Sequence, residues 1–303
     1  MVHYKWCCWA FFFAFKEERR VTVKRFGVFY GLFIALLLVV TAQAVMAQST
    51  IFNIPSGDTV DKGKAYFEFD FLPQAPGVDG VAATQTTPAI SSFRTVLINP
   101  RLVVGGPHDT EFGVNFPTYH TTASQTPNCT SSNCAYIEPN FKWKYYKNDD
   151  AGLSFVGGAL LHTPMNGKSV VAGTQLNETW GLFYGNFTKK VKTGDHGPRI
   201  SGGPYAVADS HPVAFTAYGS HRGGVILGYE QPLSKKVAFV SDWYSGKNYY
   251  GYWTPGISIT LPGNGLFNAG YSIGNDSWKD PTPSDPAHNT KNRYVFLYYG
   301  VTF

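Results

Sequence analysis

The sequence predicts an all-β, antiparallel up-and-down transmembrane β-barrel of about 12 strands. Three observations predict it: alternating apolar and polar segments about ten residues long, connections that alternate between short and long, and an aromatic last segment. A period of two places alternate side chains on opposite faces of a strand, and about ten residues let a tilted strand cross a bilayer. A soluble β-sandwich explains the strands, but it gives no reason for the alternating loop lengths.

The N-terminal part has the features of a secretory signal. Lys24 and Arg25 precede an apolar run at residues 26–40, and small residues follow up to Ala47. This order predicts cleavage after Ala47. A retained membrane anchor is the alternative, because the run is nearly long enough to span a bilayer.

Residues 1–20 are unusual for a signal, because an aromatic stretch precedes a charged one. We hypothesise that translation starts later, at Val21 or Val23. The expected organisation is therefore a leader and signal peptide at 1–47, a periplasmic lead-in at 48–63 and the barrel at 64–303. A lead-in that is tucked into the barrel mouth is the alternative for 48–63.

The charge balance changes once the leader is set aside. The whole chain has 25 Lys and Arg against 20 Asp and Glu, and the leader holds six basic and two acidic residues, which leaves 19 against 18. Charged residues make up 15% of the chain, whereas globular proteins average roughly 25%. No basic patch remains, so we expect no nucleic-acid partner.

The strand segments follow one another from residue 64 to the C-terminus. They are predicted at 64–72, 93–104, 110–120, 135–146, 151–163, 176–190, 198–208, 222–231, 236–246, 252–261, 266–275 and 293–303. Short turns alternate with longer polar loops at 73–92, 121–134, 164–175, 209–221 and 276–292. Short turns on the periplasmic side and long loops outside are typical of bacterial barrels, which places both barrel ends on the periplasmic side.

Two features modify individual strands. Pro100, Pro117 and Pro139 lie within strand patterns, and each removes one ladder donor, which predicts bulges or kinks. Aromatic residues near strand ends, Trp180 and Trp253 among them, are expected in the girdles at the membrane interfaces.

The face opposite the apolar one is expected to line the interior. In the segment 136–145, Phe141 and Trp143 share one face, whereas Glu138 and Lys142 share the other. Later strands contribute small groups such as Gly256 and Ser258, which leave room. The charged candidates for the lumen lining are Glu68, Asp70, Arg101, Glu111, Glu138, Lys142, Lys144 and Asp242. They attract small solutes, pair in a structural network, or do both; mutual neutralisation predicts weak ion selectivity.

Two cysteines remain after the leader, Cys129 and Cys134. An even pair in an exported chain predicts a disulfide that closes a small loop. A metal site is the weaker alternative, because the pair supplies only two ligands.

Catalytic and metal motifs are sparse. His162 is a candidate base with Ser154 and Ser169 nearby in sequence, but no nucleophile motif supports them. The histidines expected on the outer side show no ligand spacing: His120, His162, His211, His221 and His288. We therefore expect no catalytic residue, cofactor or metal, and no enzymatic activity.

The last ten residues carry a resemblance. Val295, Leu297, Tyr299, Val301 and Phe303 share one face of an aromatic strand. This ending resembles the C-terminal signal strand of bacterial outer-membrane β-barrels, in which a final Phe is recognised by the assembly machinery. The resemblance implies that Phe303 is the assembly signal, that this machinery is a partner and that the chain lies in the outer membrane.

In overall layout the chain also resembles transporter barrels of the aromatic-degradation-associated type. The leading hypothesis is a passive channel or selective transporter for small solutes, with outer-membrane lipid around it. The alternatives are a non-conducting structural or surface-binding barrel and an outer-membrane lipid-modifying enzyme.

Overall fold

The computed structural model describes residues 50–75, 95–121, 133–165, 170–171, 174–175, 179–191, 196–209, 222–246, 248, 250–275 and 293–303. The chain divides into two units, Met1–Ala44 and Val45–Phe303. The first unit, and with it most of the predicted leader and signal peptide, lies outside the described residues. All the described strands belong to the second unit.

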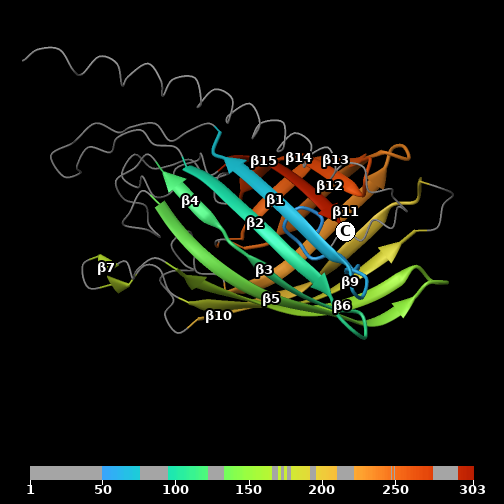
Figure 1. The fold of residues 1–303 in the computed structure, drawn as a ribbon, viewed down its shortest axis with the longest axis horizontal. Coiled ribbons are helices and arrows are strands. Elements are labelled where there is room, and N and C mark those ends of the chain that lie inside the picture. Colours follow the sequence, from blue (N-terminus) through green and yellow to red (C-terminus); the bar gives the residue numbers. More distant parts are fainter. Residues whose placement is uncertain are drawn as a thin grey trace, which may run out of the picture. The chain divides into compact units, whose positions relative to one another are not determined.

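The second unit is a closed, antiparallel, 12-stranded β-barrel (Figure 1). Its strands are β1 (Ala65–Pro73), β2 (Thr95–Gly105), β3 (Thr110–Asn115), β4 (Thr118–Thr121), β5 (Asn133–Asn148), β6 (Leu153–Pro164), β9 (Trp180–Lys190), β10 (Arg199–Asp209), β11 (Gly223–Pro232), β12 (Val237–Tyr244), β13 (Tyr252–Leu261), β14 (Gly265–Gly274) and β15 (Arg293–Thr302). β3 and β4 both pair with β2 and β5, so they are two parts of one wall strand. β1 pairs with both β2 and β15, which closes the ring.

The predicted fold class and strand number are confirmed. One difference is a small hairpin, β7 (Val170–Val171) with β8 (Thr174–Gln175), at a place where the sequence predicts only a loop. No helix in the described part of the chain is long and apolar enough to cross a membrane. The other predicted long loops fall largely outside the described residues.

The prolines affect the ladder differently from the prediction. Pro117 lies in the gap between β3 and β4, so the expected interruption occurs there. At Pro100 and Pro139, however, pairing continues without a shift of register. The register shift lies instead between Lys144 and Tyr146 of β5. A proline whose missing N–H faces a gap in the ladder costs no pairing, which explains why the wall tolerates all three.

Short connections join the strands at one end of the barrel, which we call the turn end (Figure 1). His108 and Asp109 in the β2–β3 turn, and Asn264 in the β13–β14 turn, have positive φ values of 55°, 56° and 58°, as tight turns require. β1 begins and β15 ends at this same end, where Ala65 and Phe303 exchange two backbone hydrogen bonds of 2.9 Å.

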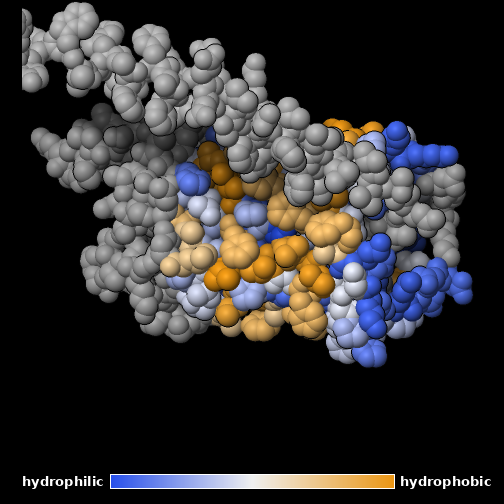
Figure 2. Space-filling model, in the orientation of Figure 1, coloured by the Kyte–Doolittle hydropathy of each residue, from blue (hydrophilic) through white to orange (hydrophobic). Residues whose placement is uncertain are grey.

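The wall is apolar outside and polar inside. On β3, Phe112 is 56% exposed, whereas the neighbouring Glu111 is only 3% exposed. Figure 2 shows apolar side chains gathered over the middle of the barrel and hydrophilic ones at the turn end. The exposed apolar belt includes Phe69, Phe71, Leu102, Phe112, Phe141, Trp143, Phe183, Ile200, Leu227, Phe239, Trp253, Ile257 and Tyr299. A soluble protein would bury these side chains, so this surface fits a bilayer.

Two sequence expectations concern side chains near the outer rim. Trp180 is not a girdle residue: it is 4% exposed and packs in the interior cluster with Leu182 and Tyr244. Cys134 is buried in β5, while Cys129 lies outside the described residues, so their disulfide stays a prediction.

Candidate functional site

The interior of the barrel is occupied by the chain's own N-terminal segment. Residues 50–60, which we call the plug, lie inside the ring of strands before β1 begins (Figure 1). Ile51, Phe52 and Ile54 are fully buried, and they form one apolar cluster with side chains from β1, β9, β10, β11, β12, β14 and β15. The segment expected as a periplasmic lead-in therefore fills the lumen over these strands.

Small residues in the wall make room for the plug. A Cβ atom on Gly228 of β11 would lie 2.4 Å from the Cδ1 atoms of Ile51 and Ile54, and one on Gly256 of β13 would lie 2.6 Å from the Phe52 ring. Such distances are far below van der Waals contact. The room that the sequence predicts along these later strands is thus taken by plug side chains.

The remaining plug contacts are polar and come from several strands. The Asp242 carboxylate on β12 accepts hydrogen bonds from the backbone N–H groups of Asn53 at 2.6 Å and Ile54 at 3.1 Å. At the other end of the plug, the Val60 N–H donates to Glu111 at 2.9 Å. Because these backbone donors have acceptors in the wall, burying them in the lumen does not cost the free energy of an unpaired polar group.

Hydroxyl and amide side chains hold the middle of the plug. Asn268 and Tyr298 donate to the Ile51 carbonyl at 3.1 Å each. The Gly57 N–H donates to the Thr188 hydroxyl at 2.8 Å, and the Ser154 hydroxyl donates to the Gly57 carbonyl at 3.2 Å. These contacts are hydrogen bonds to side chains of the wall.

A charged network faces the plug from β1 and β2. The Arg101 guanidinium lies 3.1 Å from Glu68 and 2.9 Å from Asp70. The Tyr66 hydroxyl donates to Glu68 at 2.7 Å, and the Asn99 amide donates to Asp70 at 3.0 Å. A buried charge without a partner costs several kcal/mol, so this bonding is what permits both carboxylates to lie inside.

A buried ion pair and a buried hydrogen bond continue the network across β3, β5 and β6. Lys142 is 2.9 Å from Glu111, and His162 Nδ1 is 2.6 Å from Glu138. The His162 ring is stacked on Trp180 with centroids 4.4 Å apart. Sequence reasoning did not anticipate the Glu138–His162 pair; the signal for it was that both residues fall on the inward parity of neighbouring strands.

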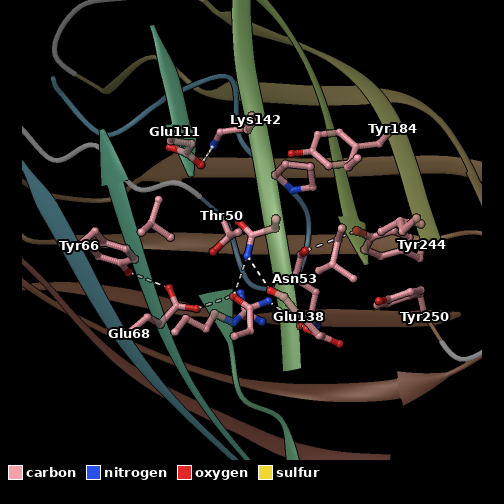
Figure 3. A pocket seen from close by; sticks show the side chains of 18 residues that line it. Thr50, Asn53, Tyr66, Glu68, Glu111, Glu138, Lys142, Tyr184, Tyr244 and Tyr250 are labelled. Carbon is pink, nitrogen blue, oxygen red and sulfur yellow. Dashed lines mark hydrogen bonds and ion pairs between the residues drawn. The ribbon is translucent and has the colours of Figure 1, made fainter. Parts of the chain in front are cut away.

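The network and the plug enclose a cavity of about 110 Å³. Figure 3 shows Tyr66, Glu68, Glu111, Lys142 and Tyr184 around it, with Thr50 and Asn53 of the plug between these wall residues. The cavity is lined by both signs of charge and by Thr50, Asn53 and Pro55 of the plug. It is the candidate site of the barrel.

The eight predicted lumen residues do not form one group. Glu68, Asp70, Arg101, Glu111, Lys142 and Asp242 have their side chains in the interior, where they contact one another or the plug. Glu138 is also buried there, and its partners are Asn115 and His162 of the wall. Lys144 is separate from them: it is half-buried and lies in a second hollow at the turn end, together with Asp58 and Lys190.

Ser154, one of the two serines weighed as neighbours of His162, does not lie beside it. Ser154 bonds to the plug near the turn end, and eight residues of strand, about 26 Å at roughly 3.3 Å per residue, separate it from His162. Ser169 lies outside the described residues, as do His211, His221 and His288. Within the described residues, no group of three or more His, Cys, Asp or Glu side chains could hold a metal ion.

Solved outer-membrane barrels show similar architecture at low identity. An outer membrane channel from Pseudomonas putida F1 is 12% identical, with coverage of 84% of this chain and 98% of its own and a TM-score of 0.47. Outer membrane phospholipase A from Escherichia coli is 11% identical, covering 80% and 92%, with a TM-score of 0.41. A Pseudomonas aeruginosa FadL homologue is 10% identical, covering 86% and 96%, with a TM-score of 0.37.

No protein-family model matches the chain, and no curated protein matches it. The structural likenesses are too distant to assign a family or an activity. The geometry of the chain itself indicates where it resides. A closed antiparallel barrel with an apolar belt outside and short turns at one end is the architecture of bacterial outer-membrane proteins. The chain is an outer-membrane β-barrel.

Proposed function

We propose that this barrel is an outer-membrane channel for small solutes whose lumen is closed at rest by residues 50–60. The observation that supports the proposal is the way the lumen is closed. A segment outside the wall strands, held by non-covalent contacts, fills it, while the wall behind that segment is charged on β1–β6 and small on β11–β14. Displacing the plug would leave a polar passage.

The energetics of the plug suit a gate. Its apolar side chains are few, and most of its other contacts are hydrogen bonds, each worth about 0.5–1.5 kcal/mol net. Water entering the lumen replaces these hydrogen bonds, while exposure of Ile51, Phe52 and Ile54 costs about 1.5–3 kcal/mol for each side chain. A twelve-stranded barrel also has a wider lumen than an eight-stranded one, whose interior is filled by its own side chains.

Planar-bilayer conductance tests the proposal. The wild-type barrel is expected to show brief, infrequent openings, and a variant lacking residues 50–60 a steady, larger conductance. A built Cβ on Gly57 lies 2.2 Å from Ser154 Oγ, so Gly57→Cys with Ser154→Cys should lock the plug. The locked barrel should not conduct until a reductant is added.

The competing function is a non-conducting structural or surface-binding barrel, which the filled lumen also suits. A deletion variant that is folded but carries no current over a wide voltage range would favour this alternative. As part of the proposal we take the chain to lack enzymatic activity, since His162 is buried between aromatic rings and bonded to Glu138. Lipid hydrolysis that disappears in His162→Ala would contradict that part.

A further inference from the structure

The turn end of the lumen holds a hollow of about 290 Å³ that is distinct from the plugged cavity. Its lining combines the basic residues Lys144, Lys147, Lys190 and Arg199 with the acidic residues Asp58 and Asp149. The lining is mostly polar, and its floor is the plug at Gly57 and Asp58. The lining of the hollow therefore has four basic and two acidic side chains, which is an excess of positive charge.

The excess positive charge lies on two particular lysines. Lys147 pairs with Asp149 at 3.1 Å, and Arg199 contacts Asp58 of the plug and, at 3.3 Å, Glu230. Within the described part of the chain, neither Lys144 nor Lys190 has a carboxylate within ion-pairing distance. Two ammonium groups therefore line this hollow without acidic partners among the described residues.

The strand register adds a second, independent observation. Lys190 of β9 and Arg199 of β10 are direct cross-strand partners, and both line the hollow. Like charges directly opposite each other in an antiparallel pair destabilise the sheet. Glu230 of β11, the other cross-strand partner of Arg199, and Asp58 of the plug both contact Arg199 and relieve this repulsion in part, whereas Lys190 has no such partner among the described residues. A bound anion would relieve it more completely.

We propose that this hollow is a binding site for a small oxyanion of the phosphate or carboxylate class. Lys144 and Lys190 supply its charge, and the anion competes with Asp58 for Arg199. Ammonium and guanidinium groups form short, charge-assisted hydrogen bonds with such oxygens. The site lies within the lumen mouth, so a soluble anion is the source that it fits. It lies on the path of the proposed channel, but its occupancy does not depend on conduction.

Calorimetric titration of the folded barrel with inorganic phosphate, in an uncharged detergent and against sodium chloride of equal ionic strength, tests the site. Wild type should bind phosphate saturably. The Lys144→Gln, Lys190→Gln double variant should bind phosphate about tenfold more weakly. Asp58→Asn should bind it about threefold more tightly, because phosphate then has no carboxylate of Asp58 to compete with for Arg199. Lys236→Gln removes one lysine at an exposed turn of the same end; it is the control for a general effect of surface charge and should bind as wild type does.

Absence of saturable binding by wild type would overturn the proposal, and so would an equal loss in Lys236→Gln, which would show a general surface-charge effect. Displacement of phosphate by added phosphatidylglycerol would instead identify a lipid headgroup as the source and overturn the soluble-anion assignment. If the double variant fails to assemble, Asp58→Asn still decides, since unchanged affinity there rules out competition for Arg199. None of these outcomes depends on conductance, so the site and the channel can fail separately.

Discussion

The burial of individual charged residues in this barrel is explained by the groups that they bond. Asp242 shows this most clearly, because its carboxylate accepts two backbone N–H groups of the plug and is itself only 2% exposed. The sequence placed Asp242 on the inward face, but it did not show what the carboxylate binds. Its partner Asn53 is 189 residues away in the chain, and no local pattern reports a contact of that kind.

Replacing Asp242 tests its role as an anchor of the plug. Asp242→Ala leaves the Asn53 and Ile54 N–H groups without their acceptor, and a buried unsatisfied donor costs about 1–3 kcal/mol. Amide hydrogen exchange of the plug peptide should therefore accelerate by about 5- to 150-fold. Mass spectrometry measures the exchange, and Asp150→Ala, an exposed residue of a turn, should leave it unchanged. Equal exchange in both variants would show that Asp242 does not hold the plug.

At the scale of elements, the plug and the wall are shaped for each other. β11, β13 and β14 carry inward glycines opposite Ile51, Phe52 and Ile54. From the sequence, these glycines predict only free space. The apolar side chains of 51–54 precede the first strand, and they are the sequence signal that something packs into that space.

Gly228→Leu tests this complementarity. The new side chain meets Ile51 and Ile54 of the plug, so it should displace the plug and raise the open fraction in planar-bilayer recordings several-fold. Adding Ile54→Ala should restore part of the closed state by returning space. Gly185→Leu is the matched control, because a Cβ there has no neighbour within 4 Å. Recordings in which Gly228→Leu behaves like Gly185→Leu would contradict the fit of plug to wall.

At the scale of the whole barrel unit, closure and the apolar belt decide where the chain resides. β1 and β15 close the wall, and Phe303 contributes both a side chain that is 63% exposed and two backbone hydrogen bonds to Ala65. A barrel with this seam paired has no open sheet edge, which lipid would not tolerate.

Two changes at Phe303 separate its side chain from its backbone. Phe303→Asp keeps both bonds to Ala65 but removes the aromatic side chain, whereas deletion removes both. If the side chain is the assembly signal, both variants should reduce the outer-membrane fraction of heat-modifiable barrel by a similar factor. Gel mobility with and without boiling measures it. Normal assembly of Phe303→Asp with loss only on deletion would assign the role to the seam bonds.

The sequence by itself determined the barrel: its fold class, its twelve strands, the turn end, and the inward position of charged residues such as Glu68 and Lys142. These features follow from alternation within one strand, which is a local property. Only the tertiary structure decided that residues 50–60 enter the lumen, that Trp180 faces inward, that Glu138 bonds His162 and that Lys144 is separate from Lys142. The plug and Trp180 depend on side chains from distant strands that meet inside a closed ring. The Glu138–His162 bond depends on the register of the neighbouring strands β5 and β6, which shifts between Lys144 and Tyr146. Which side chains meet inside the barrel depends on their volumes and charges in three dimensions. The alternation of apolar and polar residues along one strand does not specify these contacts.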